Sequence, residues 1–452
     1  MGAVTNWDGV IYANVIAEYN TSVNLLNVGQ ALLILMLGVA NIVFTPLSDK
    51  LGRRFVYLSS LLIVAASHLV LALGKNIGSY IVGHALMGIG AAPFEALPAI
   101  SISDVFFAHE RGTMLGGYVF GLAFGSFIGP ICAGYMAVNQ GSWRWVYWWG
   151  LILTAALGLV MFCTMEESRF ERPDDLSETT GIASTVTADL KVKQAKGDQK
   201  KSLGSFQASD EEVGEIFPVS RFRFFAPLWK TFPGSRSEFV RRVWRPLIVS
   251  AFPPVLWCGI NYGTCVSWLA VLGTTVSEIF SIPPYNMQPN AIGLLFISPM
   301  IGSLMGAYFA GPLNDKLSLY IAHRNNGFRE PEFRLWAFIP SALIMPAGLI
   351  IYGVCAAEGL PWISSVVGMG MVGFGLSDVA GEVVTTIILI RNIIGFGITF
   401  GIQPWIDGMG LRNTFITIGM MSLAITLFST FFIWKGKSLR RMTAARYREY
   451  RH

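Results

Sequence analysis

A short polar segment occurs twice in this chain, each time directly after an apolar run that is long enough to cross a membrane. It reads Pro-Leu-Ser-Asp-Lys-Leu at residues 46–51 and Pro-Leu-Asn-Asp-Lys-Leu at residues 312–317, 266 positions later. The repeat predicts two related halves. Duplicated halves are a known plan of secondary transporters, whose substrate site lies near the middle of the membrane between them. The repeat therefore predicts one shared site that is exposed alternately to the two sides of a membrane.

The apolar runs predict an all-α integral membrane protein. Of the 452 residues, 53% are hydrophobic and 13% are charged, whereas soluble proteins carry about 25% charged residues. A helix of about 20 residues spans a hydrocarbon core of about 30 Å, and runs of this length recur from one end of the chain to the other. They are apolar on all sides, which disfavours a large soluble helical protein, because its helices would need a polar face.

Twelve membrane-spanning helices are expected nominally, of which about eleven are recognisable. Segment 2–19 is interrupted by Asp8 and Glu18, and we interpret it as the end of a first helix whose beginning is absent. The tenth helix is shorter than its counterparts and runs almost directly into the eleventh. The recognisable spans are 24–46, 55–74, 77–103, 112–138, 143–165, 246–280, 290–313, 335–357, 361–377, 383–406 and 413–434.

Two helical bundles are expected, with a polar segment between them. The predicted N-terminal bundle covers residues 1–165 and the predicted C-terminal bundle covers residues 246–434. Residues 166–245 are rich in Lys, Asp, Glu, Ser and Thr. This central segment has too few apolar residues to form a core, so we expect a cytosolic loop that is largely disordered. Residues 435–452 form a basic tail, also expected in the cytosol.

Lys and Arg residues are distributed unevenly among the loops, which predicts the orientation of the chain. The loops at 50–54 and 316–334, the central segment and the tail are basic, whereas the opposite loops contain little besides Lys75, Arg144 and Arg412. Cytoplasmic loops carry such an excess. The net charge of +5 is thus explained by topology, and we expect no binding of nucleic acid.

The sequence contains no motif of an enzyme or of a cofactor site. Its five cysteines lie singly within or beside apolar runs, and no pair has the spacing of metal ligands. There is no Gly-x-Ser-x-Gly motif and no phosphate-binding Gly-x-x-x-x-Gly-Lys loop. We therefore expect neither an enzyme nor a metal or cofactor, but a monomer in the lipid bilayer. The plasma membrane is the expected location, and the vacuole or another endomembrane is the alternative.

The first copy of the repeat leads into a charged loop, Asp-Lys-Leu-Gly-Arg-Arg at residues 49–54. A carboxylate just past a helix end can pair with neighbouring guanidinium groups, and a glycine permits a tight turn. Such a cluster can hold two helices together in one state and release them in the other; the alternative is an ordinary basic loop. The candidate gating residues of the two copies are Leu47, Asp49, Gly52, Arg53, Arg54, Pro312, Asp315 and Lys316.

Glycines recur every four residues in the fifth span. Gly117, Gly121, Gly125 and Gly129 are followed directly by Pro130. This spacing makes a smooth helix face that allows close approach of a neighbouring backbone, and a proline frees a backbone carbonyl and permits bending. Helix packing is the simpler interpretation of this face, and a role in the transport cycle is the alternative.

Several segments resemble the major facilitator superfamily. Residues 45–54 resemble its loop signature between helices two and three, and the glycine-rich fifth span resembles its antiporter-associated signature in helix five. The strings at 104–112, 143–145, 325–334 and 391–405 are similar to fungal-type transporters near the drug:proton antiporter branch. The resemblance covers nearly the whole chain outside the central segment. It implies the two-bundle fold of that superfamily and substrates that are small, often amphipathic organic solutes.

Ionisable residues within apolar runs are the default functional candidates, because a charge at mid-membrane costs about 2.5–3.5 kcal/mol on insertion scales. Glu95 lies deep in the fourth span between Pro93 and Pro98. The resemblance implies that helices one, four, seven and ten line the central cavity, so Glu95 is a candidate for proton or substrate binding; the alternative is a buried neutral carboxyl. His84 stands where related transporters often carry an arginine, and a core histidine is its simpler interpretation.

Span seven offers aromatic rings and a hydrogen-bonding group along one face. Trp257, Asn261 and Trp268 fall near this face, and Tyr262 lies beside it. Such a mixture suits an organic ligand. Aromatic packing is the alternative interpretation of these residues.

Arg391 lies within the eleventh span and needs a partner there, because an unpaired charge inside the membrane is costly. Asp378 and Glu382 lie shortly before it in the sequence. We expect one of these two carboxylates to be its partner, and we include Glu382 and Arg391 among the candidates for the substrate and proton pathway.

These features together predict a secondary active transporter of a small organic solute, coupled to protons as in solute:proton antiport. Glu95 is the candidate coupling carboxyl, and the cluster around Asp49 is the candidate gate. Two alternatives remain open at this point. One is a proton-coupled symporter that imports a nutrient; the other is a non-transporting sensor or truncated form on the same scaffold, which the short first and tenth helices favour.

Overall fold

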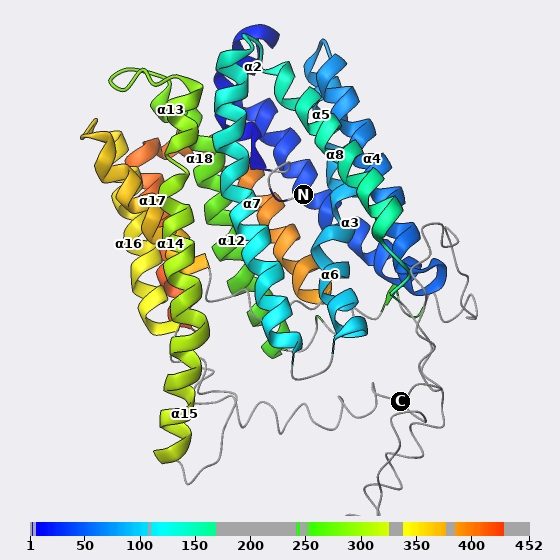
Figure 1. The fold of residues 1–452 in the computed structure, drawn as a ribbon. Coiled ribbons are helices and arrows are strands. Elements are labelled where there is room, and N and C mark those ends of the chain that lie inside the picture. The colour runs from blue at the N-terminus through cyan, green and yellow to red at the C-terminus, as the bar shows by residue number, and fades with distance from the viewer. Residues whose placement is uncertain are drawn as a thin grey trace, which may run out of the picture.

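The computed structural model describes residues 6–106, 110–168, 253–324, 338–376 and 385–428, together with a few isolated positions outside these ranges (Figure 1). All regular secondary structure within the described residues is helical. Most of the predicted central loop and the whole of the predicted basic tail lie outside them.

The N-terminal half contains the predicted spans two to six, preceded by two short helical segments in place of the first. Its fourth span is interrupted at Ala92, because the following Pro93 lacks the N–H that would continue the helical hydrogen bonds. The elements are η1 (Asp8–Val10), α2 (Tyr12–Tyr19), α3 (Val23–Leu51), α4 (Arg53–Leu73), α5 (Ile77–Ala91), α6 (Pro93–Val105), α7 (Arg111–Asn139) and α8 (Arg144–Thr164).

The C-terminal half contains the predicted spans seven to twelve. Its last element joins two of these spans at Gly410, whose φ of 77° and ψ of 157° are not helical. A glycine adopts such a positive φ without the steric cost of a side chain. The elements are α12 (Pro253–Phe280), α13 (Pro289–Leu294), α14 (Ile297–Tyr308), the π-helical turn η2 (Phe309–Leu313), α15 (Asn314–Arg324), α16 (Phe338–Ala357), α17 (Trp362–Leu376) and α18 (Thr385–Leu427).

The helices confirm the prediction of an all-α membrane protein. Among the described residues, nine helices are long and apolar enough to cross a membrane. One of them is α18, which joins two spans, so these nine helices account for ten of the predicted spans. The apolar helix α17 adds a shorter segment of 15 residues, below the roughly 20 needed to span a bilayer without adjustment. Eleven segments therefore correspond to the eleven predicted spans, with the tenth short as expected.

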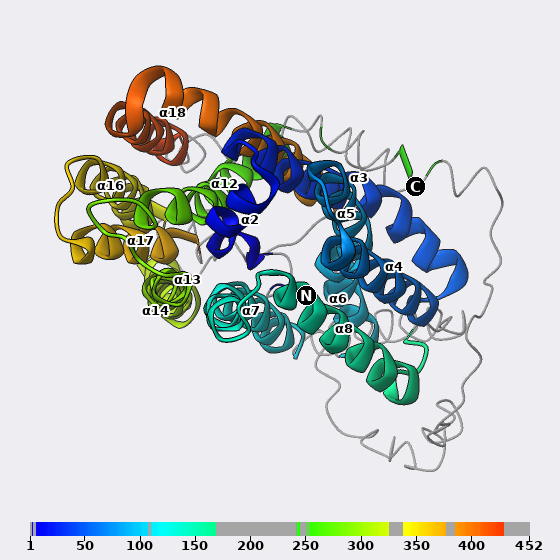
Figure 2. The same ribbon diagram turned by 90° about the horizontal axis from the view of Figure 1, so that it is seen from above.

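The two halves lie side by side, each around its own apolar core (Figures 1 and 2). The N-terminal core includes Leu33, Val64 and Tyr147, and the C-terminal core includes Trp268 and Leu349. The main contacts between the halves are those of α3 and α6 with α18, of α7 with α13 and α14, of η1 with α12 and α13, and of α2 with α12. Any site that depends on both halves must lie along these contacts.

We name the two ends of the molecule by the expected topology. The outer end carries the turns at residues 20–22, 74–76 and 140–143, and the inner end carries Gly52 and the end of α6 at Val105. By the distribution of Lys and Arg, the inner end is the one expected to face the cytoplasm.

The outer ends of the two halves are in close contact, whereas the glycine face of the inner part of α7 meets no atom of the other half. A Cβ atom added to Gly293 of α13 would lie 2.8 Å from the carbonyl oxygen of Pro130, and one added to Gly134 of α7 would overlap the backbone of α13. Towards the inner end of the same helix, Cβ atoms added to Gly117 and Gly121 would meet no atom within 4 Å. The halves are thus closed at the outer end and apart along the inner part of α7.

The two copies of the repeated segment are helical in the structure, not loops. The first copy forms the last turns of α3, which end at Gly52 with a φ of +91°. The second copy passes through η2 into α15, and the helix continues to Arg324. The difference follows from the next residue, because Ser318 stands where the first copy has Gly52 and lacks the glycine's tolerance for a helix-ending positive φ.

Glu18 is held at the outer end of the N-terminal half by Arg144 and Trp143. The Arg144 guanidinium donates to the Glu18 carboxylate and also to the carbonyl oxygen of Gly74 at 2.6 Å, while Trp143 Nε1 donates to Glu18 at 2.5 Å. The hydrogen bond from Arg144 lowers the pKa of Glu18 below its ordinary value, burial opposes this shift, and the bond from Trp143 adds to it.

Replacing Glu18 by glutamine is expected to lower the thermal stability at neutral pH but not in acid. Because the pKa of Glu18 is lower in the folded state, the pair stabilises the fold above the unfolded value of about 4.3 and loses this effect as the pH falls through the folded value. The loss at neutral pH should not exceed about 1 kcal/mol, since Glu18 is largely exposed. Melting curves of wild type and Glu18→Gln in detergent would contradict this if their difference were the same at both pH values.

Candidate functional site

An ion pair between the two halves is the centre of the candidate site. The guanidinium of Arg391, in the inner part of α18, donates to the carboxylate of Glu95 in α6. The side chains of Glu95 and Arg391 are 16% and 10% exposed, so both are largely shielded but still reach solvent. Asn392 Nδ2 donates to the other oxygen of Glu95 at 3.4 Å. A carboxylate of one half is therefore held by two consecutive side chains of the other.

Two tyrosines complete the surroundings of this pair. The Arg391 guanidinium lies 5.3 Å from the ring centroid of Tyr262 in α12 and donates to its hydroxyl at 3.4 Å. The hydroxyl of Tyr118, in α7, donates to the backbone carbonyl oxygens of Phe94 and Glu95, each at 3.0 Å. The group thus combines two elements of each half: α6 and α7 with α12 and α18.

This arrangement can bind a small solute and respond to a proton. It offers a carboxylate, a guanidinium, an amide and two phenol rings within otherwise apolar helices, the combination found in pockets for organic ligands. A proton on Glu95 would remove the negative charge that Arg391 faces and so weaken the contact between the halves. The same group can therefore serve as a ligand site and as a link between protonation and the relative position of the halves.

The structure brings together three of the predicted pathway residues: Glu95, Tyr262 and Arg391. The sequence predicted Asp378 or Glu382 as the partner of Arg391, and both of these lie outside the described residues. The partner found in the structure is Glu95, 296 positions away. Hydropathy shows which residues are unusual within a span, but not which residues of the two halves lie next to each other. The ion pair of Arg391 with Glu95 was therefore not predicted.

The other predicted residues of span seven lie at different depths. Trp257 is half-buried. Asn261 is 2% exposed, and its Oδ1 has no hydrogen-bond partner among the described residues. Trp268 is fully buried in the C-terminal apolar core, where it packs rather than faces a cavity. Of this face, therefore, only the end near Tyr262 reaches the ion pair.

His84 is buried in the N-terminal half, as expected of a core histidine, but it has an ionisable partner that the sequence did not reveal. Its Nε2 lies 3.2 Å from Oδ2 of Asp8 in η1. Asp8 also accepts a hydrogen bond from the Tyr147 hydroxyl at 2.6 Å. The sequence presented Asp8 only as an interruption of the first helix.

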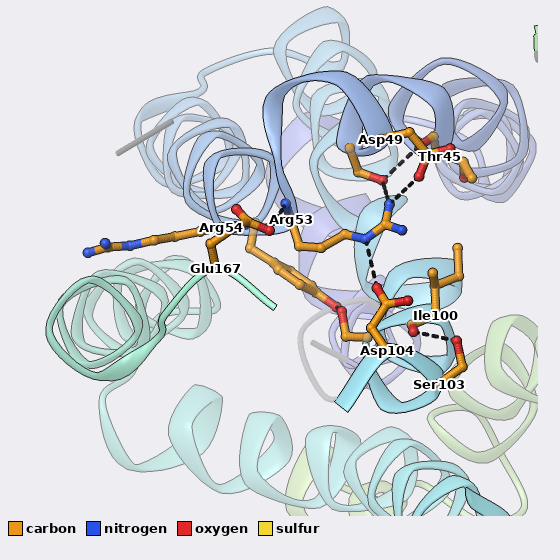
Figure 3. Close-up of polar contacts among 11 residues, drawn as sticks. Thr45, Asp49, Arg53, Arg54, Ile100, Ser103, Asp104 and Glu167 are labelled. Atoms are coloured by element: carbon orange, nitrogen blue, oxygen red, sulfur yellow. Dashed lines mark hydrogen bonds and ion pairs between the residues drawn. The ribbon is translucent and has the colours of Figure 1, made fainter. Parts of the chain in front are cut away.

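The charged cluster of the first repeat copy is built around Arg53, at the start of α4 (Figure 3). Its Nη1 donates to Asp49 at 2.7 Å and to the hydroxyl of Ser48, both in the last turns of α3. Its Nε donates to Asp104, near the inner end of α6, at 3.4 Å. The Arg53 side chain is only 5% exposed. One guanidinium thus connects the inner ends of the second and fourth spans.

Glu167, just beyond α8, caps the first turn of α4. Its two carboxylate oxygens accept from the backbone N–H groups of Arg53 at 2.8 Å and Arg54 at 3.2 Å. A helix N-terminus favours a negative charge at this place. A Cβ atom added to Gly52 would overlap the Glu167 carboxylate, so the glycine is needed both for its positive φ and for this approach. Arg54 turns away and donates to the carbonyl oxygen of Phe162 at 2.7 Å.

The cluster therefore joins four spans of the same half at the inner end. Of the predicted gating residues, Asp49, Gly52, Arg53 and Arg54 take part in it. Leu47 packs beside it in a small apolar cluster around Tyr57. The second copy places Pro312 in η2 and Asp315 and Lys316 in α15, at the inner end of the corresponding helix of the other half.

The glycine face of α7 is divided between the two ends of the molecule. Its outer part, with Pro130 and Gly134, packs against α13, and its inner part, with Gly117 and Gly121, faces open space. Gly125 and Gly129 lie between these two parts. The sequence showed the smooth face but not that only its outer part is in contact.

Three functional candidates were missed in the sequence: Tyr118, Asn392 and Glu167. Asn392 directly follows the predicted Arg391, and a polar pair inside an apolar span is a signal that could have identified it. Glu167 lies at the border of the polar central segment, where its carboxylate is one of many charged groups and so carries no distinct signal. Tyr118 lies among the glycines of α7 and resembles an ordinary interfacial aromatic.

Comparison with known proteins supports both the fold and the class. Residues 3–386 match the family model of the Major Facilitator Superfamily. The chain is 32% identical, over 483 residues covering 99% of it and 83% of the relative, to an uncharacterized MFS-type transporter of Schizosaccharomyces pombe. It is 26% identical, over 495 residues covering 98% of it and 84% of the relative, to the protein HOL1 of Saccharomyces cerevisiae.

A solved structure has the same arrangement of helices. The xylose transporter XylE from E. coli, in a partially occluded inward open conformation, matches with a TM-score of 0.61 at 15% identity, and 95% of each chain is covered. At this identity the likeness concerns the fold alone.

Proposed function

The chain belongs to the major facilitator superfamily and is a membrane transporter of that family, and we propose that it moves a small organic solute in exchange for protons by alternating access. The supporting observation is the pair of Glu95 and Arg391, because it connects the two halves inside the apolar helices. A contact between halves that rock against each other must change during the cycle. A carboxylate in such a contact makes that change depend on protonation.

In this proposal Glu95 is the coupling carboxyl and Arg391 its counter-charge. With Glu95 ionised, the pair holds α6 and α18 together. When Glu95 binds a proton, Arg391 loses its partner and becomes available to a solute, with Tyr262 and Asn392 beside it. The aromatic ring and the hydrogen-bonding groups suit an organic solute that carries at least one polar or anionic group.

Proteoliposomes with an imposed pH gradient test this function. Purified protein would be screened with labelled amphipathic solutes, and the direction of movement recorded as the gradient is reversed. Antiport predicts that the solute accumulates on the acidic side, since protons leave that side in exchange. Accumulation on the alkaline side would show a symporter instead, and binding without flux would show a sensor.

Replacing Asp49 by alanine is expected to slow transport while folding and delivery to the membrane persist. The change removes a partner of Arg53 but leaves Ser48, Asp104 and the cap by Glu167, so α4 stays in place. Flux in vesicles, compared with surface amount, measures the effect. Ser59→Ala is a matched control, because within the described residues the Ser59 hydroxyl donates to a carbonyl of its own helix. Normal turnover of Asp49→Ala would exclude the cluster from gating.

A further inference from the structure

Glu95 lies in a helical turn whose backbone hydrogen bonding is interrupted by proline. Pro93 begins α6, and Pro98 lies inside it. Proline has no N–H group, so Pro98 cannot donate to the backbone carbonyl oxygen of Phe94, four positions earlier, as the helical pattern requires. The turn that carries Glu95 therefore has a carbonyl oxygen without its helical donor. Within a membrane, such an oxygen needs a donor from a neighbouring helix or from water.

The hydroxyl of Tyr118 supplies the missing donor. It lies 3.0 Å from the carbonyl oxygen of Phe94 and 3.0 Å from that of Glu95, and it comes from α7, which packs against α6. The N–H of Ala99 is in the helical position to donate to Glu95, so Phe94 is the residue whose carbonyl oxygen depends on the tyrosine. The hydrogen bond that Pro98 removes from within the helix is thus replaced by a side chain of the next span.

The position of this turn determines where the Glu95 carboxylate points. The ring of Phe94 packs in the apolar cluster around Tyr57, with the two ring centroids 5.4 Å apart, so one side of the turn faces the N-terminal half. The next side chain, Glu95, is directed about 100° further around the helix and reaches Arg391 and Asn392 of the other half. A turn that is free to rotate or unwind would therefore move the carboxylate away from α18.

We propose that Tyr118 is a positioning residue, whose hydroxyl replaces the hydrogen bond lost at Pro98 and so keeps the Glu95 carboxylate directed at Arg391. This inference rests on the role of Glu95 in the proposed function, and adds to it the residue that holds the carboxylate in place. Without the hydroxyl, the first turn of α6 gains freedom and the ion pair between the halves is weakened. The state described here, in which the pair is formed and the outer end is closed, is then less populated.

Labelling of a single cysteine measures the population of this state without a solute or a pH gradient. In a chain whose five cysteines are replaced by serine, Ser126→Cys places a thiol in a small pocket of about 30 Å³ between the halves. Beside it, a Cβ atom added to Gly9 would overlap the backbone carbonyl of Gly273, so the pocket lies at a close contact. An impermeant thiol reagent is added from outside, and its rate is normalised to Gln140→Cys, an exposed position at the outer end.

Tyr118→Phe is expected to raise the normalised labelling rate about tenfold, because it removes only the hydroxyl and leaves the carbonyl oxygen of Phe94 without a donor. Tyr135→Phe is the matched control. Tyr135 lies in the same helix with a side chain that is 42% exposed, so its variant should be labelled at the parent rate. A rate in Tyr118→Phe equal to that of the parent would contradict the proposal.

Pro98→Ala is the decisive variant, because alanine restores an N–H group in the helical position to donate to Phe94. The double variant of Tyr118→Phe with Pro98→Ala should therefore return to the parent labelling rate. A tyrosine that acted only by filling space in α7 would not be replaced by a backbone N–H of α6. A double variant that is labelled as fast as Tyr118→Phe alone would overturn the proposal.

The variant Glu95→Gln shows whether Tyr118 acts through the carboxylate, and it separates this proposal from the proposed function. Glu95→Gln alone should raise labelling of Ser126→Cys as Tyr118→Phe does, and the two changes together should raise it no further. If their effects multiplied, Tyr118 would act independently of Glu95 and its assignment would be wrong. If labelling followed the expected pattern while proton-driven flux did not require Glu95, the proposed function would fail and the role of Tyr118 would stand.

Discussion

Glu95→Gln is expected to abolish solute accumulation driven by a pH gradient while leaving exchange of solute down its own gradient. Glutamine keeps the shape of the side chain, and its one carbonyl oxygen can still accept from Arg391, but it loses the second acceptor oxygen that faces Asn392, carries no charge and binds no proton. If the ionised pair is worth only about 1.4 kcal/mol to one of the two states, its loss shifts their populations about tenfold. Uphill transport measured in proteoliposomes should therefore fall to background.

Glu278→Gln is the matched control for this prediction. Glu278 is also a half-buried carboxyl within a span, but it accepts from Gln403 at 3.0 Å within the C-terminal half and does not connect the halves. Its variant should keep coupled transport. Coupled transport that survives Glu95→Gln with unchanged pH dependence would remove Glu95 from the mechanism.

Valine at Gly134 is expected to hold the outer end open and stop turnover. The added side chain would overlap the backbone of α13 in the state described here. Overpacking of this kind costs about 1–3 kcal/mol, which corresponds to a shift in populations between about fivefold and about 150-fold. Flux should fall accordingly, and a cysteine at Ser126 should be labelled from outside faster than in the parent.

Gly121→Val, in the same helix, is the matched comparison for Gly134→Val. For this variant we expect no opening of the outer end. In the present state a Cβ atom added at Gly121 meets no atom within 4 Å, so the outer end should close normally and labelling at Ser126→Cys should stay slow. Flux should nevertheless fall, because the inner part of α7 must approach the other half when the outer end opens. Equal labelling in Gly134→Val and Gly121→Val would argue against division of this glycine face between two states.

The spans could be predicted from the sequence because each is an apolar run whose length matches the membrane. Predicted span 143–165 and observed helix Arg144–Thr164 differ by one residue at each end. The repeated segment was placed correctly but was wrongly described as a loop, since polar residues beyond a span do not by themselves end a helix. Gly52 ends the first copy, and its absence lets the second continue to Arg324.

The candidate site could be predicted only as separate residues. Glu95, Tyr262 and Arg391 were identified because charges and polar aromatics are rare within spans, but their pairing depends on how two halves pack. Asp8 was interpreted only as an interruption of the first helix, because its partner His84 lies 76 positions later in the sequence. Polar residues inside a membrane protein are visible in its sequence, whereas their partners become visible only in the fold.

The rocking of the two halves is measured most directly by distances between spin labels in lipid nanodiscs. One pair, at Met114 and Tyr308, spans the inner end, and the other, at Gln140 and Gln288, spans the outer end; all four side chains are exposed. Pulsed electron paramagnetic resonance at acidic and alkaline pH should show the outer distance lengthening as the inner one shortens. Two distances that stay fixed, or that lengthen together, would contradict alternating access of a site between the halves.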